Sequence, residues 1–190
     1  MNPSHVTNIT SLDGTPLPAS SSVKYLGIRI RSDARQNDTV SIRIGKCMAA
    51  FNKMSAFWAH AHIPTDLKLR IYKAVFYPML MYALHHSWLI KSQMRALDSW
   101  QAKTLRRVLR IKASMISHTT NAYILSLART QPISSLIRAQ RFKYYGHILR
   151  TSQDNAIRNI CLTPACTQRR LTIKRKKGRP LDNWLRKVSQ

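Results

Sequence analysis

The side chains that could hold catalytic metal ions are few and scattered in this sequence. The chain has no glutamate and only seven aspartates, against 32 Lys and Arg residues, which gives a formal net charge of +25. None of the aspartates lies within four residues of another: Asp13, Asp33, Asp38, Asp66, Asp98, Asp154 and Asp182. Two-metal catalysis needs clustered carboxylates. The sequence therefore predicts no catalytic residue and no cofactor, while its charge predicts a polyanionic partner.

Histidine and cysteine do not offer a second route to chemistry. The candidates for metal binding or nucleophilic catalysis are His60, His62, His85, His86, His147, Cys47, Cys161 and Cys166. Structural zinc sites usually combine tightly spaced cysteine pairs, whereas Cys161 and Cys166 form a single loose pair. Cys47 lies in an apolar stripe, where cysteine usually serves as a small core residue. We therefore expect no metal site, and the three cysteines favour a reducing, intracellular compartment.

Basic residues, by contrast, are segregated on two predicted helices. The predicted phosphate-binding residues are Lys103, Arg106, Arg107 and Arg110 on the first helix and Arg141, Lys143 and Arg150 on the second. A helix with one apolar and one cationic face can pack on a core and contact backbone phosphates at the same time. A solvated surface helix usually mixes charges of both signs, and here the negative sign is nearly missing. We therefore expect contact with the phosphates of RNA or DNA.

A second concentration of charge lies at the C-terminus. Between Arg169 and Arg179, seven of eleven residues are Lys or Arg. The predicted nucleic-acid-binding residues of this tract are Lys174, Arg175, Lys176, Lys177 and Arg179. Such a tract is typical of a flexible basic arm or a nuclear-entry signal, so a nuclear location is expected. Lys176–Pro180 also resembles the core of an AT-hook, which inserts Arg-Pro into a narrow minor groove.

The elements that would position these residues are mainly helices. Polar and apolar residues alternate over Val23–Arg31, which predicts a β-strand that could pair with a strand near Val6–Thr10. Apolar residues at helical spacing then predict helices, over about 44–58, 66–89, 92–110, 121–128, 132–149 and 155–161. The fold class is therefore mainly α: an N-terminal β-hairpin, a helical bundle, and a basic, partly disordered C-terminal tail. The predicted domains are residues 1–38, 39–165 and 166–190.

The most apolar stretch of the chain falls in the second predicted helix. Its buried stripe is predicted to comprise Leu67, Ile71, Ala74, Val75, Pro78, Met79 and Tyr82, and Pro78 should kink or split the helix. The apolar run Ala74–Leu84 is shorter than the roughly 20 residues that cross a bilayer. The chain also begins without the basic and apolar regions of a signal peptide. No membrane partner is expected.

Four strings in this order and at this spacing resemble the C-terminal part of non-LTR retrotransposon (LINE-like) reverse transcriptases. The strings are VKYLGI at 23–28, IYKAVFYPMLMY at 71–82 with Trp88, RFKYYGHILR at 141–150, and Gly178-Arg179-Pro180 with Trp184. They are similar to that family's hairpin after the palm, its thumb helix, its GHxLR helix and its terminal GRPxxxW element. The resemblance covers about residues 23–188.

The resemblance implies a helical thumb that grips a template–primer duplex through its phosphates. Tyr25 would lie near the 3′ end of the primer, and a portion of reverse transcriptase that contains the palm would be a second partner. The aromatic-x-Asp-Asp metal site of the family precedes the hairpin, and no such string occurs here. The chain also has Ala83 and Ser87 where the family usually has glycine and an acidic residue. We therefore expect no polymerase activity from this chain alone.

Two other interpretations remain open at the level of sequence. One is a free-standing basic adaptor that docks on another protein and binds DNA through its AT-hook-like arm. The other is a non-functional product that folds poorly, because Leu26, Ile28 and Ile30 would stay exposed without a palm to cover them.

Overall fold

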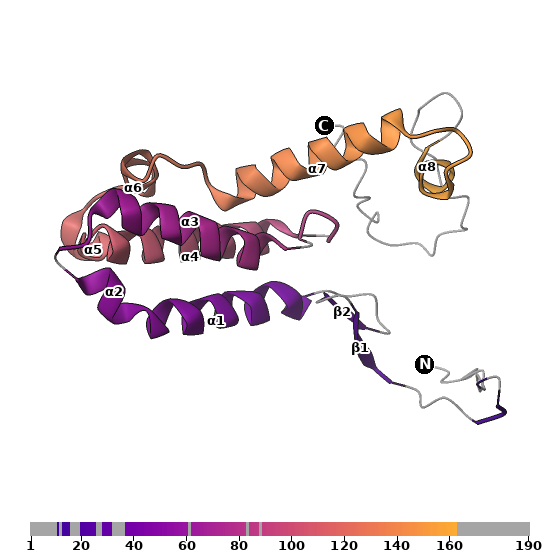
Figure 1. Cartoon of the computed structure of the whole chain (residues 1–190), viewed down its shortest axis with the longest axis horizontal. Helices are drawn as coiled ribbons and strands as arrows, with labels where there is room; N and C mark the ends of the chain where they lie inside the picture. Colours follow the sequence, from indigo (N-terminus) through magenta and orange to yellow (C-terminus); the bar gives the residue numbers. More distant parts are fainter. Residues whose placement is uncertain are drawn as a thin grey trace.

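The structure of the protein is a computed structural model, which describes residues 11, 13–15, 20–25, 28–31, 37–60, 62–82, 84–87 and 89–162. Within these ranges the chain is mainly α-helical, which confirms the predicted fold class. The helices form a bundle in which α3 and α4 lie in the middle, with α1 and α7 on either side (Figure 1). In the described part of the chain, no helix combines the length and apolarity needed to cross a bilayer.

The N-terminal strands form a two-stranded antiparallel hairpin. Strand β1 (Ser22–Tyr25) pairs with β2 (Ile28–Arg31), and Val23 lies opposite Ile30. The prediction of one strand over Val23–Arg31 was therefore wrong, because the alternation of side chains continues through both strands and does not reveal the reversal between them. The proposed partner strand near 6–10 lies outside the described residues.

The first predicted helix is divided in two by a turn at Met54. Helix α1 (Asn37–Lys53) ends there and the short helix α2 (Ser55–Ala59) begins. The turn folds Trp58 back onto Phe51, so that the two rings stack with centroids 5.1 Å apart. The indole N–H of Trp58 also donates a hydrogen bond of 3.0 Å to the carbonyl of Phe51. Aromatic packing therefore fixes the junction of the two helices.

Helix α3 (Thr65–Met81) runs without a break through Pro78. The predicted split is therefore wrong, and the helix ends eight residues before the predicted end at 89. Tyr82 and residues 84–86 form turns. The amide of Tyr82 still donates a hydrogen bond to the carbonyl of Pro78.

The buried face of α3 also differs from the predicted one. Its core residues are Leu69, Tyr72, Phe76, Tyr77 and Leu80. Most of the predicted stripe faces solvent instead, including Leu67, Val75, Met79 and Tyr82. The predicted stripe and the observed buried face both have helical spacing. The face with the large aromatic residues is the buried one, because these side chains bury more area against α1 and α4.

Helix α4 (Lys91–Val108) is the central helix of the bundle. It packs against α1, α2, α3, α6 and α7. The apolar spacing of this segment predicts six inward residues: Met94, Leu97, Gln101, Leu105, Val108 and Leu109. Four of them, Leu97, Gln101, Leu105 and Val108, are buried, and Met94 and Leu109 are half-buried. The remaining helices are α5 (Ser114–Ser117), which the sequence did not predict, α6 (Asn121–Leu127), α7 (Ile133–Arg150) and α8 (Ala156–Cys161).

A fully buried glutamine joins three parts of the bundle. The amide nitrogen of Gln101 donates to the Tyr77 hydroxyl at 2.8 Å and to the carbonyl of Gln131 at 3.0 Å. Its amide oxygen accepts from the backbone N–H of Ile133 at 3.0 Å, at the start of α7. Since buried polar groups cost free energy unless they are paired, this network fixes how α7 begins relative to α3 and α4.

We predict that Gln101→Leu lowers the free energy of unfolding by about 2–4 kcal/mol, because it leaves the Ile133 N–H and the Gln131 carbonyl without this partner. Urea denaturation of the purified chain measures the change. Gln153→Leu, at an exposed turn position, is the control and should change it by less than about 0.5 kcal/mol. Equal stability of the two variants would contradict the role of the network.

Candidate nucleic-acid interface

The solvent-facing side of α4 carries a row of basic residues. Lys91, Arg95, Lys103 and Arg107 are exposed, and their spacing places them on one side of the helix. We call these four residues the α4 cationic row. Because α1, α3, α6 and α7 occupy the other sides of α4, the row is bordered by neighbouring helices and held on a rigid element.

The Arg107 side chain contacts α1. Its guanidinium carbon lies 4.9 Å from the centre of the Phe51 ring, and one guanidinium nitrogen donates to the Asn52 side-chain oxygen at 2.7 Å. These contacts bind the end of α4 to α1 while the side chain stays exposed. A cation–π contact of this kind restricts the side chain without neutralising its charge.

The single acidic residue of α4, Asp98, is half-buried and contacts α7. A carboxylate oxygen of Asp98 accepts a hydrogen bond of 2.9 Å from the backbone N–H of Ser134, in the first turn of α7. A carboxylate is favourable there because the first amides of a helix lack partners within the helix and carry partial positive charge. Asp98 therefore caps the first turn of α7, while the four members of the α4 cationic row stay exposed.

Arg106 does not belong to the interface, which corrects the prediction from sequence. Its side chain is only 7% exposed. Its guanidinium donates to the Asn121 side-chain oxygen at 2.8 Å and to the carbonyl of Thr119 at 2.9 Å. Arg106 thus joins α4 to the segment before α6, and its charge does not reach solvent.

Arg110 is exposed, but it lies beyond the end of α4 and not on its face. Its φ of 57° is left-handed. The amide of Arg110 donates to the carbonyl of Arg107, and the amide of Ile111 donates to that of Arg106. This is the pattern of a Schellman C-cap, so the chain reverses at Arg110 and the side chain leaves the helix at a new angle.

Helix α7 contributes fewer cations than the sequence predicted. Lys143 and Arg150 are exposed as expected, and Arg138 is exposed with them. Arg141 is 7% exposed and donates to the carbonyl of Ser87 at 2.8 Å, so its prediction as a phosphate ligand is wrong. Burial lowers the pKa of the Arg141 guanidinium, and the nearby Arg138 lowers it further.

Two other predicted parts of the interface cannot be placed. The backbone of Tyr25 ends β1, but its side chain lies outside the described residues. The same holds for the whole basic tract, and with it for Lys174, Arg175, Lys176, Lys177 and Arg179.

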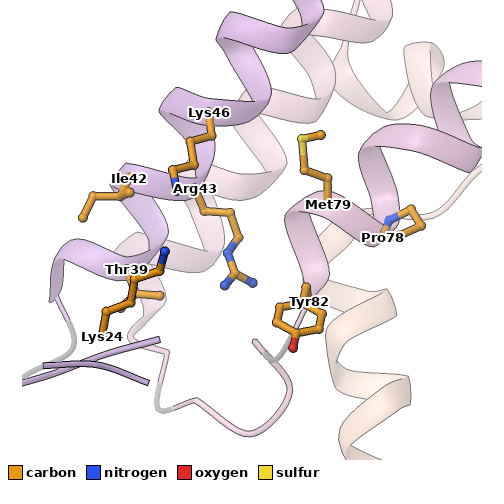
Figure 2. Close-up of a pocket in the computed structure, with 8 residues that line it drawn as sticks. All are labelled: Lys24, Thr39, Ile42, Arg43, Lys46, Pro78, Met79 and Tyr82. Carbon is orange, nitrogen blue, oxygen red and sulfur yellow. The ribbon is translucent and has the colours of Figure 1, made fainter. Parts of the chain in front are cut away.

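Sequence reasoning missed a cationic pocket between the hairpin, α1 and α3. The cavity measures about 630 Å³. It is lined by Lys24 of β1, by Thr39, Ile42, Arg43 and Lys46 of α1, and by Pro78, Met79 and Tyr82 at the end of α3 (Figure 2). These residues are far apart in sequence and belong to no motif. Arg43 is also one of 32 Lys and Arg residues, so no sequence signal distinguishes it.

The histidines do not gather into a metal site in the described part of the chain, where no group of three His, Cys, Asp or Glu side chains could hold a metal ion. His85 and His86 pack ring to ring with centroids 3.8 Å apart, and His86 also packs edge-on against Tyr144. Burial lowers the pKa of both histidines, and the charges of His86 and Arg141 lower that of His85 further. Both shifts favour the neutral form of the rings.

No protein-family model, curated protein or solved structure matches this chain.

We predict opposite effects for two neighbours on α4. Arg106→Ala should lower the free energy of unfolding by about 2–3 kcal/mol, because it removes charged hydrogen bonds, and should leave the salt dependence of duplex binding unchanged. Lys103→Ala should change stability by less than about 0.5 kcal/mol and reduce the slope of log K against log salt by about one.

Urea denaturation and fluorescence anisotropy with a labelled duplex at several salt concentrations measure these two effects. A drop in salt slope for Arg106→Ala, or none for Lys103→Ala, would contradict the assignment of the two residues.

Proposed function

We propose that this chain binds duplex or hybrid nucleic acid through its phosphates, as a thumb-like fragment related to the C-terminal part of non-LTR retrotransposon reverse transcriptases. The observation that carries the proposal is the α4 cationic row, whose four basic residues face solvent while the only carboxylate of that helix caps α7. Such a surface repels itself in isolation, and a row of phosphates relieves the repulsion.

The binding is expected to be independent of base sequence. The α4 cationic row consists of long side chains on a helix surface, one of which, Arg107, stacks on Phe51. Lys143 and Arg150 of α7 are further exposed positive charges. Contacts of this kind position a backbone and carry no base readout. Each phosphate neutralised releases counterions, so the affinity should fall steeply as salt rises.

The fragment would not polymerise on its own. The aspartates that the family uses for its metal ions have no counterpart among the scattered aspartates of this chain, and phosphoryl transfer by this route needs a carboxylate pair. A portion of reverse transcriptase with the palm is therefore the proposed second partner, and a nuclear location is the proposed setting because of the basic tract.

The alternative, a basic adaptor with an AT-hook-like arm, is favoured by one feature, the tract Arg169–Arg179. Under this alternative, most of the affinity for nucleic acid would come from the basic arm and not from the helical body. The two proposals are separable by removing each cationic region in turn.

We predict that replacing Lys103, Arg107 and Lys143 together by glutamine weakens duplex binding at about 0.1 M salt by roughly tenfold or more and lowers the salt slope by about 2–3. The matched control replaces Arg70, Lys112 and Arg129, which are also exposed, and removes the same charge. Anisotropy titrations with one labelled duplex compare the two triple variants with a chain that lacks residues 169–190.

Most of the affinity should survive deletion of residues 169–190. Complete loss of binding on that deletion would favour the adaptor, and equal losses in the two triple variants would show that total charge, not the α4 cationic row, decides the affinity.

We also predict that the purified chain incorporates no nucleotide on primed RNA in the presence of Mg²⁺, because it lacks the paired carboxylates of the family. Primer extension with labelled nucleotides, beside a complete reverse transcriptase as positive control, is the measurement. Primer elongation by the chain alone would contradict the proposal.

A further inference from the structure

The pocket between the hairpin, α1 and α3 brings cations and an aromatic ring together. Figure 2 shows Arg43 extending from α1 toward Tyr82 at the end of α3, with Lys46 above and Lys24 below. The guanidinium carbon of Arg43 lies 5.7 Å from the centre of the Tyr82 ring. Tyr82 remains 59% exposed even so, so most of its surface is available to a ligand.

The polar side of this pocket suits an anion. Lys24, Arg43 and Lys46 contribute positive charge, and none of the lining residues that the structure describes is acidic. Arg43 is only 9% exposed, and burial lowers the pKa of its guanidinium. An anion in the pocket would offset the cost of removing this charge from water.

A second polar group supports the same view. Thr39 is 6% exposed, and its hydroxyl oxygen has no hydrogen-bond partner among the residues that the structure describes. Buried hydroxyls are usually paired. Since Thr39 lines the pocket, a phosphate or sugar oxygen bound there could complete its hydrogen bonding.

The other wall of the pocket is apolar. Met79 and Tyr82 at the end of α3 are 40% and 59% exposed, and they line it together with Pro78. An exposed aromatic ring and a methionine next to a cluster of cations match a nucleotide, which has a base to stack and a phosphate to pair. Inorganic phosphate would leave this wall uncovered, and an apolar peptide would leave the cations unpaired.

We propose that this pocket holds one unpaired nucleotide of a nucleic-acid strand, with its base against Tyr82 and Met79 and its phosphate between Lys24, Arg43 and Lys46. The inference rests on the proposed function, because it assumes a strand bound to the same molecule. It adds a preference for duplexes that carry a single-stranded end, which the phosphate contacts of the α4 cationic row do not supply.

The test compares two duplexes with the full chain. One duplex is blunt and the other carries a short 3′ extension of thymidines, and fluorescence anisotropy gives the Kd of each at the same salt. The ratio of the blunt-duplex Kd to the extended-duplex Kd should be about ten, because one base stacked on an aromatic side chain strengthens binding by about that factor. The same extension with abasic sites, which keeps the phosphates and lacks the bases, should lower the ratio but leave it above one, because the phosphate contacts remain.

Variants then assign the preference to the pocket. Tyr82→Ala should lower the ratio to about the value of the abasic extension, whereas Tyr82→Phe should keep it, since the ring and not the hydroxyl receives the base. Lys46→Gln, at an exposed position, should lower the ratio in part. Tyr123→Ala on α6 removes an equally accessible ring outside the pocket and is the matched control.

A wild-type ratio near one, an unchanged ratio in Tyr82→Ala, or an abasic extension that binds as well as the thymidine one would overturn the inference. Free thymidine monophosphate that binds at least as tightly as the extension, in a Tyr82-dependent manner, would show that a free nucleotide is the ligand and would overturn it too. Failure of the proposed function would look different, as blunt-duplex binding that is absent or insensitive to salt.

Discussion

The scarcity of carboxylates is the constraint on which the rest of this structure depends. With seven aspartates against 32 Lys and Arg residues, most cations cannot be paired with an acidic side chain. The bundle uses carbonyl oxygens instead. Lys68 is 3% exposed and its amine donates to the carbonyls of Trp58 and His60, at the C-terminal end of α2. The last carbonyls of a helix are unpaired and partly negative, which makes them suitable partners for a cation.

The same solution recurs through the bundle. Arg106 donates to the Thr119 carbonyl after α5, Arg141 to the Ser87 carbonyl in the turns after α3, and Arg158 to the carbonyls of Leu149 and Thr151 at the end of α7. Cations thus satisfy carbonyl oxygens in the segments between helices, and Asp98 performs the complementary task at the start of α7, where it accepts from a backbone N–H.

This use of cations divides them into two groups with different tasks. The cations that donate to carbonyl oxygens join helices and are unavailable to a ligand. The exposed group, which includes the α4 cationic row and Lys143 and Arg150 of α7, keeps its full charge because the chain offers it few acidic partners. Under the proposed function, a phosphate backbone supplies the negative charge that the chain itself lacks.

Much of the architecture could be predicted from the sequence. The period of the apolar residues predicted α4, α6, α7 and α8 nearly to the residue, and it predicted the inward position of Gln101, because these helices bury one continuous stripe. The apolar period did not predict the buried face of α3, because two faces of that helix have helical spacing. Only the fit of Tyr72 and Phe76 against α1 and α4 decides between them.

The candidate site was harder to predict for a related reason. A helical wheel places Arg106 near Lys103 and Arg107, but it cannot show that α6 packs over Arg106 and leaves Lys103 free. Nor can it show that Arg43 and Tyr82, which are distant in sequence, meet across a pocket. Which cations are buried is a property of the packing of whole helices, and local periodicity carries no information about it.

The most direct test of the account is a lysine acetylation footprint, read by mass spectrometry, of the full chain with and without a nucleic-acid duplex. The account predicts that Lys103 and Lys143 are acetylated in the free protein and protected by the duplex, while Lys68, bonded to carbonyls in the interior, resists acetylation in both. Acetylation of Lys68 in the folded protein, or protection by the duplex that is equal at every exposed lysine, would contradict it.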